Sequence, residues 1–276
     1  MNVPFDFTAF ESEVRTPFFR EAGAGSGVVC LHANASNSWQ WRALMDRLSQ
    51  RFHVLAPDSY GAGKSPAWPV HKRVALSDEV ALLEPVFARA GHPLTLIGHS
   101  YGAAVALIAA LGRPHRMRAL CLYEPTLFSL IEAEADPPND ADGIRDALVF
   151  AAAALEAGSP TAAAESFIDY WTGIGAWASM PAARRGALAA AIINIQGWGN
   201  ALFSEPTPLR AFRALRVPIL YMVGKESPAS SKGVARLLVN ALPNVEVVEL
   251  EGMGHMAPVT HPEIVNEVIA GFLGRV

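Results

Sequence analysis

The sequence has little charge and almost no cysteine. Charged residues make up 17% of its 276 residues, against 51% hydrophobic residues, and there are two cysteines. Cys30 and Cys121 each lie inside a short apolar run, "VVCLH" and "ALCLYE". A thiol in such a run behaves as a small hydrophobe, so the pattern favours two separate buried cysteines over a disulfide or a metal pair.

The sequence also lacks a long apolar run and an excess of basic residues. No run approaches the roughly 18 apolar residues of a membrane span, and the net charge of −4 is spread over interspersed acidic and basic residues. The first 14 residues, "MNVPFDFTAFESEV", are acidic and contain Pro4, unlike a signal peptide. We therefore expect a cytoplasmic protein that binds a small neutral or weakly charged molecule, and neither nucleic acid nor a membrane.

Short apolar runs of strand length recur along the chain, and turn residues follow each of them. Continuous rather than alternating hydrophobicity is typical of strands that are covered on both faces. Helix-like segments lie between the runs, so the order predicts an α/β protein with a mainly parallel, doubly wound sheet and right-handed crossovers. The six runs are 27–34, 52–61, 94–102, 118–125, 217–224 and 245–252.

This alternation stops for roughly 90 residues between Pro125 and Val217. The stretch is rich in alanine and helix-forming residues, and several of its prolines stand where a helix can begin. Interleaved aromatic residues supply surface to bury, which argues against disorder. We therefore predict a core at 1–125 and 215–276 that carries an inserted helical cap at 126–214.

The run at 94–102 ends in "GHSYG", residues 98–102, and passes directly into the helix-like "AAVALIAALG". The pattern G-x-S-x-G suits a strained turn between a strand and a helix, because its glycines remove side chains that would collide with neighbouring elements. Such a turn presents Ser100 at the carboxyl end of the sheet as a nucleophile. A serine that merely caps the helix is the alternative, and the strand before it favours the nucleophile.

Four motifs together resemble the α/β-hydrolase superfamily over nearly the whole chain. "LHANASNSW", "APDSYGAGKS", "GHSYG" and "GMGHMAP" stand in the order and spacing at which that superfamily carries its oxyanion loop, glycine turn, nucleophile elbow and histidine loop. The resemblance implies a fold and a mechanism but not a substrate. The stretch "GAGKS" is not a phosphate-binding loop, because Asp58 stands where that motif requires glycine.

A serine hydroxyl needs an imidazole to take its proton. His255 follows the last strand-like run in a glycine-hinged loop, where the superfamily has its general base. The resemblance further implies that the backbone N–H groups of Asn34 and Tyr101 form the oxyanion hole, with Ala33 where relatives usually have glycine. The loop "HANASNSWQWR" also resembles that of haloalkane dehalogenases, which need an aspartate nucleophile. Ser100 therefore argues against dehalogenation and against epoxide hydrolysis.

The carboxylate that orients the imidazole has two candidate positions. Most of the superfamily carries an aspartate three residues after the glycine that here is Gly224, but that place holds Ser227, and Glu226 is one residue early. Some members carry the acid after the strand that neighbours the nucleophile's strand. Here that strand ends in "CLYEP", so Glu124 lies 24 residues after Ser100. Parallel neighbouring strands end at one edge of a sheet, and this geometry favours Glu124, with Glu226 as the alternative.

Aromatic side chains of the cap and of the oxyanion loop are candidates for an apolar substrate pocket over the serine. For any one of them, the alternative is a place in the cap's own core. The residues concerned are Trp39, Trp41, Phe128, Trp171 and Trp177.

The sequence therefore predicts a serine hydrolase for a small, largely apolar carboxylic ester or lactone, acting through an acyl-enzyme. Hydrolytic C–C cleavage of a vinylogous diketone on the same scaffold is the alternative reaction. A catalytically idle, ligand-binding relative is the other alternative, because the usual aspartate is absent at Ser227. The sequence indicates no metal or other cofactor and leaves the oligomeric state open.

Overall fold

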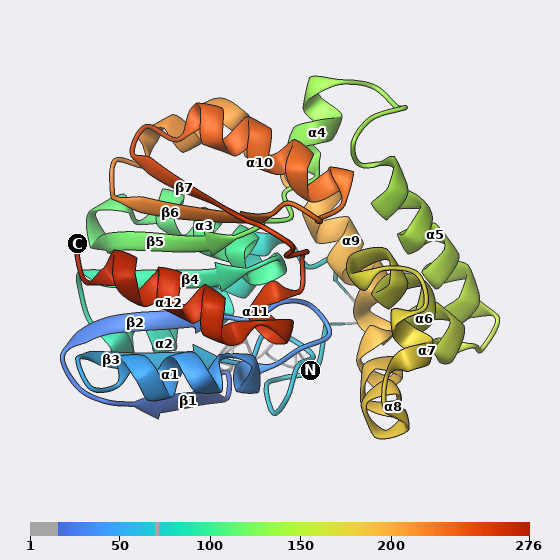
Figure 1. The fold of residues 1–276 in the computed structure, drawn as a ribbon, viewed down its shortest axis with the longest axis horizontal. Coiled ribbons are helices and arrows are strands. Elements are labelled where there is room, and N and C mark those ends of the chain that lie inside the picture. The colour runs from blue at the N-terminus through green and yellow to red at the C-terminus, as the bar shows by residue number, and fades with distance from the viewer. Residues whose placement is uncertain (1–15, 70–71) are drawn as a thin grey trace, which may run out of the picture.

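A sheet of seven strands forms the centre of the computed structural model, which describes residues 16–69 and 72–276 (Figure 1). The strand order is β1-β3-β2-β4-β5-β6-β7. Only the pairing of β1 with β3 is antiparallel within the described residues. The strands are β1 (Phe19–Ala22), β2 (Ser26–Leu31), β3 (Phe52–Pro57), β4 (Leu94–His99), β5 (Met117–Tyr123), β6 (Ile219–Gly224) and β7 (Val245–Leu250).

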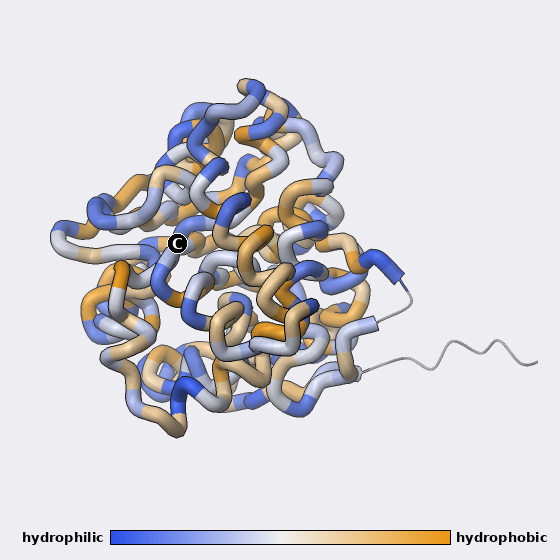
Figure 2. The backbone as a smooth tube through the Cα atoms, turned by 90° about the vertical axis from the view of Figure 1, so that its right-hand side faces the viewer, coloured by the Kyte–Doolittle hydropathy of each residue, from blue (hydrophilic) through white to orange (hydrophobic). Residues whose placement is uncertain are grey.

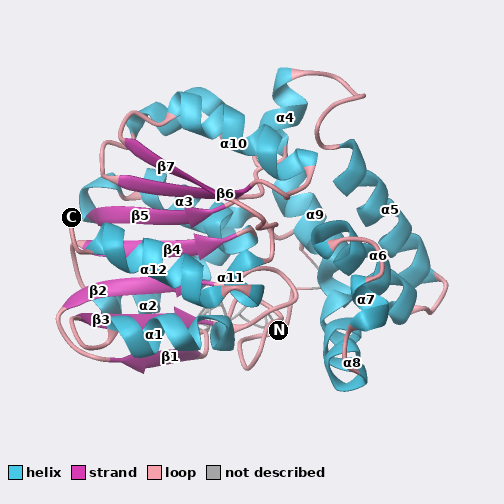
Figure 3. Ribbon diagram, viewed as in Figure 1, coloured by secondary structure: helices cyan, strands magenta, loops and turns pink. Residues whose placement is uncertain are grey.

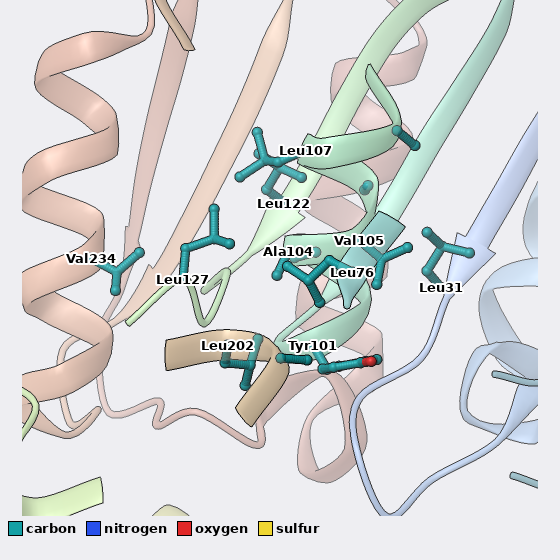
Figure 4. Close-up of a cluster of buried hydrophobic side chains, with 14 of the residues drawn as sticks. Leu31, Leu76, Tyr101, Ala104, Val105, Leu107, Leu122, Leu127, Leu202 and Val234 are labelled. Atoms are coloured by element: carbon teal, nitrogen blue, oxygen red, sulfur yellow. The ribbon is translucent and has the colours of Figure 1, made fainter. Parts of the chain in front are cut away.

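Helices cover both faces of this sheet (Figure 3). On one face, Leu44 of α1 and Phe272 of α12 pack in a buried cluster with strand residues such as Cys30. On the other face, α2, α3 and α10 pack against the alternate strand side chains. Figure 4 shows Leu107 of α3 beside Leu122 of β5, and Val234 of α10 beside Leu127. These helices are α1 (Arg42–Leu48), α2 (Leu76–Ala90), α3 (Tyr101–Gly112), α10 (Ala229–Ala241), α11 (Ala257–Thr260) and α12 (Pro262–Leu273), with the 3-10 helices η1 (Ser38–Trp41) and η2 (Pro114–Arg116).

Burial on both faces explains the continuous apolar runs of the central strands. All six residues of β4 are buried, from Leu94 to His99. Cys30 and Cys121 are both buried and both free. The prediction of a mainly parallel α/β fold is therefore confirmed.

Between β5 and β6, all the regular secondary structure in the described residues is helical. They stand beside the carboxyl ends of the strands, at the right of Figure 1, and hydrophobic and hydrophilic residues alternate along them in Figure 2. The cap boundaries at 126 and 214 stay a prediction. The elements are α4 (Ser129–Glu134), α5 (Asp142–Glu156), α6 (Pro160–Thr172), α7 (Ala176–Ser179), α8 (Ala182–Ala191), η3 (Ile192–Asn194), α9 (Ile195–Phe203) and η4 (Leu209–Ala214).

Each of the six predicted strand runs contains most or all of one observed strand. The short antiparallel strand β1 was not predicted. Within the described residues, none of the helices combines the length and the apolar character that crossing a membrane requires. The interpretation of residues 1–14 as unlike a signal peptide falls outside the described residues.

Candidate active site

Ser100 occupies a strained turn between β4 and α3. Its backbone has φ 56° and ψ −118°, a conformation that side-chain-bearing residues rarely adopt. The turn is held on the strand side by a hydrogen bond of 2.9 Å from the Ser100 N–H to the carbonyl oxygen of Tyr123. Ser100 is 6% exposed. Strain of this kind persists only where the surroundings enforce it, and it is typical of a nucleophile elbow.

Two glycines allow the turn to pack this closely. A side chain at Gly98 would overlap the backbone of Ala103 in α3, and one at Gly102 would overlap the carbonyl oxygens of Leu31 and His32. The helix therefore starts directly against the end of β2. This contact brings the start of α3 next to the loop that follows β2.

That loop and the start of α3 supply the two predicted oxyanion donors. Tyr101 is the first residue of α3, so its N–H has no acceptor within the helix and lies at the positive end of the helix dipole. Asn34 lies in the loop after β2, directly before Ala35, whose φ of 52° is strained for a residue with a side chain. His32 stabilises this loop, because its ring bonds the Ala33 carbonyl oxygen at 2.7 Å and accepts from the Ser59 N–H at 3.0 Å.

His255 and Glu124 form a buried hydrogen-bonded pair. The Nδ1 atom of His255 lies 2.7 Å from Oε2 of Glu124, and the two residues are 1% and 0% exposed. Because a carboxylate only accepts hydrogen bonds, Nδ1 carries the proton and Nε2 presents its lone pair. The Ser231 hydroxyl lies 3.3 Å from the same Nδ1 atom.

Glu124 is held as a carboxylate by three hydrogen-bond donors. Its Oε1 atom accepts from the Gly224 N–H at 2.7 Å and from the Ser227 hydroxyl at 2.5 Å, opposite the bond to His255. Burial alone would raise the pKa of Glu124. The bond to His255 and the attraction of its ring when protonated, followed by the bonds from Ser227 and Gly224, outweigh burial and lower the pKa of Glu124 below its ordinary value.

Glu226 is exposed, one residue before the buried Ser227. Of the two glutamates predicted as alternative acids, Glu124 is the one that contacts the imidazole. Ser227 stands at the position where the resemblance to the superfamily implies an acid, and its hydroxyl donates a hydrogen bond to Glu124 instead. Sequence reasoning missed this role of Ser227, because the bond joins residues 103 positions apart.

The imidazole and the serine come from neighbouring parts of the site. The ring of His255 lies 5.1 Å, centroid to centroid, from the ring of His99, which directly precedes Ser100. In the described part of the chain, the Ser100 hydroxyl and the His255 ring do not form a hydrogen bond. Such bonds are often long without substrate and tighten when the reacting complex forms.

An aromatic cluster in the helical segment between β5 and β6 meets the imidazole through one of its rings. The ring of Trp171, in α6, stacks on the ring of His255 at 3.9 Å between centroids and an interplanar angle of 27°. Phe128 stacks on Trp171 at 6.4 Å, and Phe167 meets Trp171 edge-on at 6.2 Å. Of the predicted pocket residues, Trp171 therefore contacts the candidate triad directly, and Phe128 lies next to Trp171. Trp177 is buried among other cap residues in the same hydrophobic cluster.

The structure does not support a pocket role for Trp39 and Trp41. Trp39 is 55% exposed, and the guanidinium groups of Arg20 and Arg42 lie over its ring at 4.4 and 5.3 Å. Trp41 is 1% exposed and packs in the core between the sheet and α1 and α12. The two tryptophans of η1 thus point to the surface and to the opposite core.

A second buried carboxylate lies near the predicted oxyanion hole. Glu79, in α2, accepts hydrogen bonds of 3.2 Å from the Tyr101 hydroxyl and 3.2 Å from the Tyr60 N–H. Burial raises the pKa of Glu79 to about 7. Among the described residues, histidine, cysteine and carboxylate side chains do not gather in groups that could hold a metal ion.

Comparison with known proteins agrees with the fold. A family model described as "Alpha/beta hydrolase family" matches residues 28–268. The 2-(acetamidomethylene)succinate hydrolase of Mesorhizobium japonicum is 28% identical over 92% of this chain and 90% of that protein. A crystal structure of E-2-(acetamidomethylene)succinate hydrolase superimposes with a TM-score of 0.67 at 25% identity, covering 93% of this chain and 94% of that one.

A haloalkane dehalogenase of Agrobacterium fabrum is 31% identical, over 48% of this chain and 42% of its own length. The chain thus spans less than half of that relative.

Proposed function

Because the chain belongs to the alpha/beta hydrolase family, we propose that it is a serine hydrolase that cleaves a small, largely apolar carboxylic ester or lactone. The observation that carries the proposal is the buried hydrogen bond between His255 and Glu124, close to the strained turn at Ser100. Acyl transfer through an acyl-enzyme requires a hydroxyl next to an imidazole that is in turn bonded to a carboxylate.

The first half of the reaction acylates Ser100. Its Oγ attacks the ester carbonyl carbon while Nε2 of His255 takes the hydroxyl proton. Glu124 then faces an imidazolium across a 2.7 Å hydrogen bond and stabilises its charge. The N–H groups of Asn34 and Tyr101 donate to the oxyanion. The bond to the leaving oxygen breaks as that oxygen takes the proton from His255.

The second half repeats these steps with water. His255 accepts a proton from water, the resulting hydroxide attacks the acyl carbon, and the bond to Ser100 Oγ breaks as Oγ regains the proton. A lactone follows the same course and gives a hydroxy acid. Serine also argues against the chemistry of the dehalogenase relative, because the alkyl-ester intermediate of that chemistry needs a carboxylate nucleophile.

The aromatic surroundings support an apolar substrate. Trp171 stacks on the imidazole and Phe128 stacks on Trp171, and such surfaces bind hydrocarbon better than charge. The guanidinium of Arg145 lies 5.8 Å from the ring of Phe203, which contacts Phe128. This guanidinium is paired with Glu132 and Asp142. A cation that is already neutralised is a poor receptor for a substrate carboxylate.

The name of the Mesorhizobium relative suggests a second candidate, hydrolysis of an acylated aminomethylene succinate. That substrate carries carboxylates, whereas the ring that stacks on His255 is the apolar indole of Trp171. Incubation of the protein with an ester, with an acylated aminomethylene succinate and with a vinylogous diketone, followed by product analysis, distinguishes the three reactions.

Turnover of p-nitrophenyl acetate, butyrate and octanoate tests the proposal. We expect hydrolysis by the wild type, loss in Ser100→Ala, and covalent labelling of Ser100 by a fluorophosphonate. The matched pair for the acid is Glu124→Gln against Glu226→Gln, since Glu226 is an exposed glutamate of the same size. Normal turnover in Ser100→Ala, or a collapse confined to Glu226→Gln, would overturn the assignment.

A further inference from the structure

Three hydrogen bonds join the oxyanion loop to the loop of His255. The Ala33 N–H donates to Oε1 of Gln40 at 3.1 Å. The other end of the Gln40 amide, Nε2, lies 3.1 Å from Nδ1 of His99. The opposite ring nitrogen, Nε2 of His99, lies 2.9 Å from the carbonyl oxygen of His255. This hydrogen-bond chain therefore runs from the residue before Asn34, through the residue before Ser100, to the backbone of the proposed general base.

The two ends of this chain fix the direction of every bond in it. At one end, the backbone N–H of Ala33 can only donate, so the Gln40 oxygen must face it. At the other end, the His255 carbonyl can only accept, so His99 must carry its proton on Nε2. Nδ1 of His99 is then a bare acceptor, which matches the N–H that Gln40 presents. Glutamine and neutral histidine satisfy all three bonds at once.

The environment keeps His99 neutral. Burial, followed by the neighbouring charge of His255, lowers the pKa of His99 well below its ordinary value, and His32 acts in the same direction. A doubly protonated His99 would present an N–H to the amide N–H of Gln40, and the hydrogen bond between them would be lost. Tyr123, the partner of His99 on β5, donates its hydroxyl to the Gly254 carbonyl oxygen at 2.8 Å. Consecutive carbonyl groups of the histidine loop are thus held from β4 and β5.

We propose that Gln40 and His99 are positioning residues that set the oxyanion loop and the His255 loop at a fixed distance from each other. The inference rests on the proposed function, since it assigns these loops to the oxyanion hole and the general base. With the Ala33 N–H bound to Gln40, the N–H of Asn34 is the next one available to an oxyanion. Neither Gln40 nor His99 touches the reacting atoms, so both act through the groups they hold.

The first test is kinetic. Gln40→Met preserves side-chain length and removes both hydrogen bonds, and Gln50→Met is the matched control at an exposed glutamine. A misplacement of about 1 Å in a catalytic group costs on the order of 100-fold in rate. We expect Gln40→Met to lower kcat by about 10- to 100-fold with KM little changed. An unchanged kcat, with Gln50→Met also normal, would overturn the proposal.

The second test uses a pH signature that general destabilisation would not produce. In Gln40→Glu, one carboxylate oxygen still accepts from Ala33, but the other faces Nδ1 of His99. All three hydrogen bonds then form only while the new carboxyl and His99 together hold one extra proton, so kcat/KM should fall as the pH rises through this added ionisation. Neither the wild type nor Gln40→Met should show it. A Gln40→Glu profile that matches Gln40→Met contradicts the proposal.

A third measurement does not depend on catalysis. Histidine 15N NMR should show His99 as the neutral Nε2–H tautomer in the wild type across neutral pH, and an altered Nδ1 shift in Gln40→Met. The opposite tautomer in the wild type refutes the chain directly. If the wild type neither hydrolyses esters nor reacts with fluorophosphonate, the proposed function fails and this inference fails with it. If both reactions occur but the Gln40 variants behave as wild type, only this inference fails.

Discussion

Ser227 is the position to which we expect the proposed catalytic carboxylate can be moved. The proposed acid, Glu124, bonds His255 at 2.7 Å, and Ser227 bonds the other oxygen of that carboxylate at 2.5 Å. Replacing a triad carboxylate by its amide costs about 10⁴-fold in kcat, so we expect a loss of that order in Glu124→Gln. The amide can still contact Nδ1 but cannot stabilise the imidazolium.

Adding Ser227→Asp to Glu124→Gln should restore part of this activity. The new carboxylate replaces the hydroxyl beside the amide of residue 124, in the same buried pocket. We expect kcat about 10- to 100-fold above Glu124→Gln alone, which corresponds to about 1.4 to 2.7 kcal/mol of transition-state stabilisation. Full recovery is not expected, because the carboxylate approaches the imidazole from a different strand.

Ser227→Asp alone should have the opposite effect. It places two carboxylates side by side, and two like charges about 4 Å apart repel by about 4 kcal/mol at an effective dielectric of 20. One of the two groups then retains a proton, so both kcat and the melting temperature should fall below wild type. The same substitution is thus harmful in one background and helpful in the other.

Steady-state turnover of p-nitrophenyl butyrate by the four proteins measures this cycle. Ser100→Ala sets the background, and thermal melting reports whether each variant is folded. A double variant no more active than Glu124→Gln would show that a carboxylate at 227 cannot reach the imidazole. Equal activity of Glu124→Gln and wild type would refute Glu124 as the acid.

Three further changes test other parts of the site. Glu79→Gln should stabilise the protein more at pH 8 than at pH 5. The pKa of Glu79 is raised by burial from 4.5 to about 7. The loss of folding stability caused by ionising Glu79 is therefore absent below pH 4.5 and complete above about pH 7, where it reaches about 3 kcal/mol. Thermal melts at both pH values measure this, and an equal shift at each would contradict it.

Trp171→Leu should lower kcat/KM about 5- to 30-fold, because the stacked indole contributes about 1 to 2 kcal/mol to the imidazolium. Wild-type kcat/KM would refute that role. Gly102→Ala should destabilise the fold by about 1 to 3 kcal/mol, since the methyl group overlaps the end of β2. Denaturant unfolding measures this loss of stability. An unchanged midpoint would show that the turn shifts to accommodate the methyl group without loss of stability.

Short-range patterns account for the parts of the fold that the sequence predicted. The six strand runs are continuous because their strands are covered on both faces, and the G-x-S-x-G turn marks its own place between β4 and α3. β1 was missed because "FREA" is short, edge-lying and partly exposed, so it contains no apolar run. Its pairing with β3 is a long-range contact.

Side-chain direction limited what could be predicted at the site. Trp39 and Trp41 stand two residues apart in η1, yet one is exposed and the other is in the core. Residues at i and i+2 of a helix never share a face, so composition alone could not separate them. Gln40, between them, reaches His99 across 59 positions of sequence. No local motif marks such a contact.

Strain links the proposed nucleophile and the proposed acid. Ser100 has φ 56° and Glu124 has φ 45°, and each directly follows the end of one of the neighbouring strands β4 and β5. A residue with a side chain in this region costs about 1 to 3 kcal/mol, so the surroundings must enforce both turns. The Ser100 N–H bonds Tyr123, and the Glu124 N–H bonds the Met222 carbonyl oxygen at 3.2 Å. The sheet thus turns both side chains out at one edge, which explains how an acid on β5 can serve a nucleophile on β4.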